Sequence, residues 1–66
     1  MGDEITPKMK EVLQLLAKGY NAKEIGKKLE NSDATINTIR HQMIRRFRAK
    51  NVTHLVYIAT KEGWIE

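Results

Sequence analysis

The sequence predicts an all-α fold with four helices, and three observations support this prediction. Apolar residues recur with helical spacing in four segments, a residue that favours helix N-termini precedes each segment, and no stretch alternates apolar and polar residues between two turn signals. We expect the helices at about residues 7–18, 22–29, 33–47 and 52–62. A chain of 66 residues has room for one domain, which we expect to span residues 1–66.

Local signals mark both ends of the first helix and the start of the second. Thr6 supplies a hydroxyl N-cap, and Pro7 follows at the first helical position, where its missing N–H is harmless. Gly19 ends the first helix. Asn21 caps the second helix, and Glu24 three residues later completes a capping box. The apolar stripes of the two helices are Met9, Val12, Leu13 and Leu16, and then Ala22, Ile25, Gly26 and Leu29.

Polar residues also mark the starts of the last two helices. Ser32 or Asn31 caps the third helix, and Asp33 in its first turn suits the positive end of the helix dipole. Asn51 caps the fourth helix, which Gly63 ends. Residues 52–58 include several that favour strands, but three apolar residues at helical spacing favour a helix: Leu55, Val56 and Ala59.

The net charge of +4 is concentrated in the second half of the chain. Six lysines and six acids cancel over residues 1–33, whereas residues 34–66 carry six cations and two acids. All four arginines fall between Arg40 and Arg48, and no acid lies between Asp33 and Glu62. Such a block could be a solubilising helix face, but the absence of interleaved acids favours a polyanionic partner.

Composition excludes several classes of protein. Without cysteine there is neither a disulfide framework nor a cysteine-ligated zinc, and no apolar run reaches the roughly 20 residues of a membrane span. The first residues lack the pattern of a signal peptide, so we expect a cytoplasmic protein. So small a scaffold, with His41 and His54 as its only histidines, leads us to expect no enzyme, no catalytic residue, no metal site and no cofactor.

The third helix carries two contrasting faces. At 100° per residue, one stripe is apolar and should face the core: Ile36, Ile39, Met43 and Phe47. The opposite side is small or polar at its start and cationic at its end: Ala34, Asn37, Thr38, His41, Arg45 and Arg48. Those residues could simply face solvent. A helix that enters the DNA major groove needs such a face, since short side chains reach base edges and arginines meet phosphates or guanine.

These features resemble a known family. The pair Thr6-Pro7, the segments EVLQLLAKGY (11–20), NAKEIGKKL (21–29) and SDATI (32–36), and the pair Lys50-Asn51 are similar to the LuxR/GerE-type helix-turn-helix domain. The resemblance covers about residues 5–65. It implies a four-helix DNA-binding domain of bacterial transcription regulators, with the third helix recognising DNA and the last helix forming a dimer. Such domains usually follow a sensor or receiver domain, so the chain is expected to be either an excised domain or a small stand-alone regulator.

The resemblance also implies roles for particular residues. Those expected to read bases are Asn37, Thr38 and His41. Those expected to bind DNA phosphates are Lys23, Thr35, Arg45, Lys50, Arg40, Arg46 and Arg48. The last three of these stand at places where the family lacks such contacts. Those expected in a dimer interface are Val52, Leu55, Val56, Tyr57, Ile58, Ala59 and Trp64. Trp64 and Ile65 have a second interpretation, as a hydrophobic cap over the first helix.

Five positions depart from the family pattern, so a base preference cannot be carried over from it. Asn37 stands where the family commonly has lysine, Ile39 where it has histidine, and Arg48 where it has glycine. Asn31 replaces an apolar residue, and Val52 replaces an arginine. The missing histidine and arginine remove two phosphate contacts. Arg40, Arg46 and Arg48 could replace these contacts at new places.

We therefore expect a sequence-specific transcriptional regulator from a bacterium or its phage. It should bind double-stranded DNA as a homodimer on two half-sites, with its third helix in the major groove. The alternative is a protein-binding module that contacts RNA polymerase or another regulator and does not read sequence. Discrimination of about 10³ or more for one DNA site would separate the two, because any basic protein binds random DNA.

Overall fold

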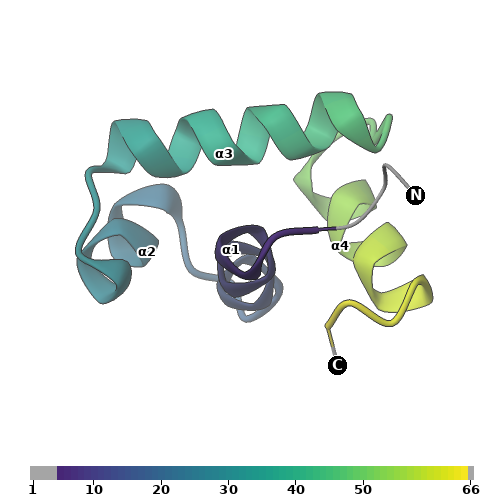
Figure 1. Ribbon diagram of the computed structural model, residues 1–66, viewed down its shortest axis with the longest axis horizontal. Helices are drawn as coiled ribbons and strands as arrows, with labels where there is room; N and C mark the ends of the chain where they lie inside the picture. Colours follow the sequence, from purple (N-terminus) through teal and green to yellow (C-terminus); the bar gives the residue numbers. More distant parts are fainter. Residues whose placement is uncertain (1–4, 66) are drawn as a thin grey trace.

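The computed structural model describes residues 5–65 and shows the four predicted helices (Figure 1). They are α1 (Pro7–Ala17), α2 (Ala22–Leu29), α3 (Asp33–Arg46) and α4 (Val52–Lys61), and there is no strand in the described range. The all-α fold is thus confirmed. Helices α1, α3 and α4 each end one residue earlier than predicted, because Lys18, Phe47 and Glu62 occupy the C-cap positions.

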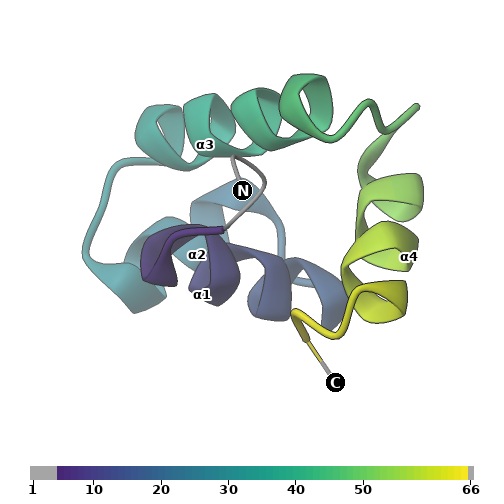
Figure 2. The same ribbon diagram turned by 45° about the vertical axis from the view of Figure 1, so that its right-hand side comes forward.

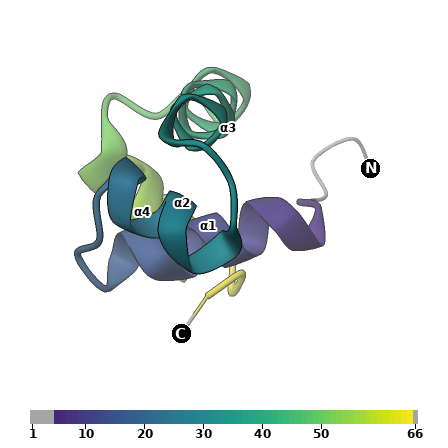
Figure 3. The ribbon, with the colours of Figure 1, turned by 90° about the vertical axis from the view of Figure 1, so that its left-hand side faces the viewer.

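Helix α3 lies across the other three helices and is covered on one side only. In Figure 1 it runs along the top of the molecule, with α2, α1 and α4 beneath it. Figure 3, which views α3 end-on, shows that no other helix lies on its outer side. Figure 2 shows that α4 stands at one end of the molecule, so its outer side is also uncovered by other helices. The fold therefore leaves one free face on α3 and another on α4.

Side-chain caps begin all four helices at the predicted residues. Asn21 Oδ1 accepts a hydrogen bond from the Glu24 N–H, and Glu24 Oε1 accepts one from the Asn21 N–H, both at 2.9 Å. The capping box is therefore complete. The choice left open for α3 falls on Ser32, whose Oγ accepts from the Thr35 N–H at 3.1 Å, and not on Asn31. Caps of this kind stabilise a helix by about 1 kcal/mol each.

The core draws on every helix and on the C-terminal segment. Its fully buried side chains are Val12, Leu13, Ile25, Ile36, Met43, Leu55 and Ala59, and Ile65 is nearly buried. Of the apolar stripe predicted for the third helix, Ile36 and Met43 are fully buried, whereas Ile39 and the C-cap residue Phe47 are half-buried at the edge of the core. Each large apolar side chain in this core contributes about 1.5–3 kcal/mol through its burial.

The turn between α2 and α3 lies close against Gly26. A Cβ atom at Gly26 would lie only 2.6 Å from the backbone oxygen of Asn31. Glu30 adopts the left-handed conformation (φ 57°), and the Asn31 N–H donates to the Gly26 oxygen at 2.8 Å. This close backbone approach fixes how α3 leaves α2.

The aromatic residue after α4 packs on the end of α3. The Trp64 and Phe47 rings have their centroids 4.7 Å apart and are tilted by 50°. This contact places Trp64 beside the end of α3. Ile65 lies next to the first helix, since it is 6% exposed and borders, together with Gln14, Ala17 and Lys18, a hollow of about 310 Å³ beside α1. Within the described residues, none of the helices combines the length and apolar character that a membrane span requires.

Candidate nucleic-acid interface

The outer face of α3 presents several of the side chains that the sequence assigned to DNA recognition. Thr38, His41 and Arg45 are exposed and follow one another at intervals of three and four residues, which places them along one line of the helix. Asn37 lies beside this line and is half-buried. The three proposed base-reading residues therefore lie within two turns of α3. Figure 3 shows that no other helix covers the outer side of α3.

The hydroxyl groups near the start of α3 are occupied within the helix. Thr38 Oγ1 donates to the backbone oxygen of Ala34 at 3.0 Å. Thr35 Oγ1 and Ser32 Oγ are 2.9 Å apart, so one of them donates to the other. Both threonines are nevertheless exposed. Thr38 is left with its methyl group and oxygen lone pairs for a partner outside the protein.

Arg40 differs from the other arginines because part of its side chain is buried. Its Nε is buried and has no hydrogen-bond partner, and the residue as a whole is half-buried. One terminal nitrogen, Nη2, lies 3.5 Å from His41 Nε2. Arg40 thus reaches the surface beside His41 with its stem against the protein.

The remaining cations assigned to phosphates are exposed but come from several elements. Lys23 lies in the first turn of α2, and Arg45 and Arg46 lie in the last turn of α3, where cations suit the helix dipole. The Arg46 guanidinium lies over the Phe47 ring, 5.7 Å from its centroid. Arg48 and Lys50 follow in the turn before α4 and are also exposed.

The sequence suggested that Arg48 extends the outer face of the third helix, but in the structure it does not. The helix ends at Arg46, and Arg48 lies in the turn in the left-handed conformation (φ 59°). The Arg48 N–H donates to Arg45 O at 3.3 Å and the Ala49 N–H to Ile44 O at 2.9 Å, which is the Schellman arrangement. The position suits glycine, as in the family pattern.

One exposed residue of this face was not predicted as a DNA contact. Gln42 is exposed and lies four residues after Thr38 and three before Arg45, so it borders both. Its amide group can donate and accept, which suits base edges or phosphates. In the sequence, the spacing of four residues between Thr38 and Gln42 was the signal that could have identified Gln42 as part of this face.

The outer side of α4 matches the dimer prediction only in part. Tyr57 is 60% exposed, and four others of the predicted set are half-buried: Val52, Val56, Ile58 and Trp64. The inclusion of Leu55 and Ala59 is wrong, because both are fully buried inside the single chain and offer no surface to a second copy. Their side chains face the core one turn apart.

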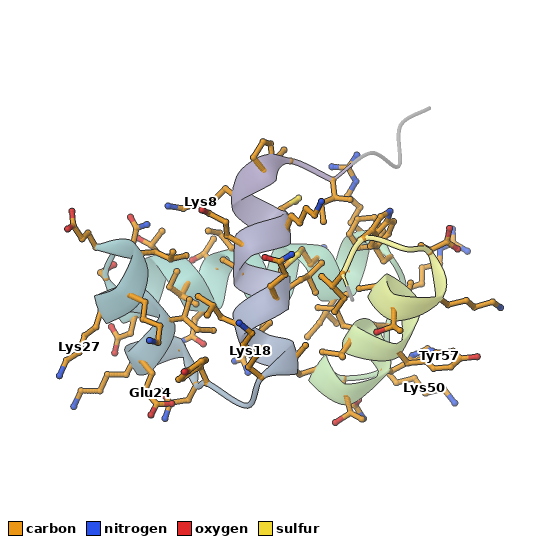
Figure 4. The ribbon with its side chains drawn as sticks, turned by 90° about the horizontal axis from the view of Figure 1, so that it is seen from below. Lys8, Lys18, Glu24, Lys27, Lys50 and Tyr57 are labelled. Carbon is orange, nitrogen blue, oxygen red and sulfur yellow. The ribbon has the colours of Figure 1, made fainter. Side chains whose placement is uncertain are left out.

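A small cluster connects the turn before α4 to the exposed tyrosine. His54 Nδ1 accepts a hydrogen bond from the Lys50 N–H at 2.9 Å, which leaves this nitrogen without a proton. The His54 and Tyr57 rings stack with their centroids 6.3 Å apart. Figure 4 shows the Lys50 and Tyr57 side chains projecting together at the α4 end of the molecule. Nowhere in residues 5–65 do three histidine or acidic side chains gather as they would to hold a metal ion.

Comparison with known proteins connects this arrangement to a family. The sequence profile of the bacterial regulatory proteins of the luxR family matches residues 3–59. The chain is 36% identical over 67 aligned residues to the uncharacterized transcriptional regulatory protein YvfU of Bacillus subtilis (strain 168), covering 98% of this chain and 34% of YvfU. It is 29% identical over 62 residues to the transcriptional regulatory protein DesR of the same organism, covering 94% of this chain and 31% of DesR. The chain thus spans about a third of the length of these relatives.

Proposed function

We propose, from the premise that this chain belongs to the luxR family of bacterial regulatory proteins, that it reads DNA sequence with α3 in the major groove. The family consists of regulators and not of enzymes. One observation carries the proposal: the face of α3 that no other helix covers bears short polar side chains at its start and Arg45 at its end. Asn37, Thr38 and His41 would meet base edges, with Asn37 suited to adenine.

Phosphate contacts from several elements would hold α3 in register on the duplex. Arg45 and Arg46 at the end of α3 and Lys50 in the following turn would bind the backbone where the helix leaves the groove. Lys23 from α2 would bind on the side of the helix-turn-helix opposite to that turn. The complete set in this proposal is Lys23, Thr35, Arg40, Arg45, Arg46, Arg48 and Lys50.

Two copies of the chain would occupy two half-sites through contacts between their α4 helices. Among the described residues, Tyr57 is the one large apolar side chain that is mostly exposed, at 60%. Val52, Val56 and Ile58 are half-buried on the same helix. Burying such a group against a second copy would remove apolar surface from water. The dimer would set the spacing of the half-sites at one DNA helical turn or a multiple of it. Acting on the DNA of a bacterium or its phage, the protein would work in the cytoplasm.

Selection of bound sequences from a random double-stranded DNA pool tests this function. We expect one enriched motif with two related half-sites, bound about 10³-fold or more tightly than random DNA at the same salt concentration. A pool that yields no motif, with equal binding of all sequences, would contradict sequence reading. In that case a protein partner, such as RNA polymerase or another regulator, would be the better candidate.

A further inference from the structure

The first half of the α3 outer face presents methyl groups whose neighbouring hydroxyls are already bonded. Ala34, Thr35 and Thr38 carry these methyl groups, and all three are exposed. The Thr38 hydroxyl donates to Ala34 O at 3.0 Å, and the Thr35 hydroxyl is paired with Ser32 at 2.9 Å. Breaking the Thr38 bond to make a contact with DNA would exchange one hydrogen bond for another with little gain.

Among the bases, thymine alone carries a methyl group on the floor of the major groove. A side chain with a free methyl and a committed hydroxyl proton discriminates thymine by apolar contact and cannot donate to a base acceptor without losing its own bond. Thr38 and Ala34 lie one turn apart on one line of α3, so their methyl groups share a strip of the surface.

From this geometry we infer that Thr38, with Ala34 beside it, recognises the C5-methyl group of a thymine in each half-site. The inference rests on the proposed function, since it requires α3 to lie in the major groove. It identifies Thr38 as a specificity-determining residue that acts through its methyl group and not through its hydroxyl.

A pair of substitutions separates the two halves of the threonine side chain. Thr38→Val keeps the methyl group and removes the hydroxyl, whereas Thr38→Ser keeps the hydroxyl and removes the methyl. Thr60 offers a matched control, because it is an exposed threonine on α4 whose hydroxyl donates to Val56 O at 2.9 Å in the same i to i−4 manner. Thr60→Ser and Thr60→Val should leave DNA binding unchanged, and thermal unfolding of all four variants reports on their folding.

The binding site for the test is the motif that the wild-type chain selects from random DNA. Each thymine of one half-site is then replaced in turn by deoxyuridine, which lacks only the methyl group. We expect one replacement to weaken wild-type binding about fourfold, the effect of losing one buried methyl contact. Thr38→Val should show the same loss on that duplex, while Thr38→Ser should bind the thymine duplex about fourfold more weakly and be indifferent to the replacement.

Other outcomes separate failure of this inference from failure of the proposed function. If a motif is selected but Thr38→Ser binds like the wild type and Thr38→Val does not, the hydroxyl reads the base and the inference is wrong. It is equally wrong if a motif is selected and wild-type binding responds to none of the deoxyuridine replacements. If no motif is selected, the proposed function itself fails and this inference fails with it.

Discussion

Replacing Gly26 by alanine tests whether the close approach of the α2–α3 turn positions α3. The new Cβ would lie 2.6 Å from Asn31 O, and 3.3 Å from the backbone carbon of Ser32, so the backbone of the turn must move. Overpacking of this kind costs about 1–3 kcal/mol. The Asn31 N–H bond to Gly26 O, at 2.8 Å, is strained at the same time, which adds about 1 kcal/mol.

The helix propensity of alanine offsets part of this cost. Alanine is better than glycine inside a helix by about 1 kcal/mol, so the net destabilisation of Gly26→Ala is about 1–3 kcal/mol. In a domain of this size each kcal/mol lowers the Tm by about 4–8 °C. The DNA affinity should fall as well, because α3 would leave α2 at a different angle.

Thermal and denaturant unfolding followed by circular dichroism measure the effect. Lys27→Ala, at an exposed position of the same helix, is the control and should change the free energy of unfolding by less than about 0.5 kcal/mol. If Gly26→Ala is as stable as the wild type, or more stable, the turn yields without cost and the reasoning is refuted.

Four further predictions concern the ends and faces of the helices. Arg48→Gly should be about 1 kcal/mol more stable than Arg48→Ala in denaturant unfolding, because the left-handed backbone favours glycine; equal stabilities would show that this turn is not strained. Asn37→Ala should cost about 1–3 kcal/mol of binding free energy at one base position and relax the preference there; an unaltered preference would contradict base reading by Asn37. Arg45→Ala should weaken binding to all sequences and lower the slope of log affinity against log salt concentration by about one, with Lys10→Ala on α1 as the control. An unaltered slope would contradict a phosphate contact by Arg45. Tyr57→Ser should raise the dissociation constant of the homodimer in sedimentation experiments while leaving the helical circular dichroism intact, and an unchanged association would move the interface away from α4.

Local signals explain why the helices could be predicted to within one residue. A cap acts over three residues, as Asn21 and Glu24 do, so it can be read directly from the sequence. Apolar spacing likewise identified Ile36 and Met43 as core residues, because both lie on one stripe of α3. The uncovered face of α3 follows from the same periodicity.

Contacts between distant segments explain what the sequence did not reveal. The pairing of Trp64 with Phe47 depends on where the chain returns after α4, and no local pattern specifies that return. The burial of Leu55 and Ala59, on the side of α4 opposite to exposed Tyr57, depends on which side of α4 faces α1 and α3. A periodic pattern gives the angle between side chains on one helix, but the partner helices decide which of them are covered.

Backbone conformation explains why the position of Arg48 could not be predicted from the sequence. Arginine rarely adopts a positive φ, so nothing in its identity placed Arg48 in a left-handed turn. Only the family pattern, with glycine at that position, carried the signal. The half-buried stem of Arg40 was equally invisible, since a block of arginines in a sequence indicates charge and not depth.

Chemical-shift mapping tests most directly whether the outer face of α3 binds DNA. The ¹⁵N-labelled chain would be titrated with the selected duplex and, separately, with a scrambled duplex of equal length. With the selected duplex we predict the largest changes at Ala34, Thr38, His41 and Arg45 and at the side-chain amide of Asn37, and these should shrink with the scrambled duplex. Changes confined to α1 or to α4, with α3 unperturbed by either duplex, would contradict the assignment.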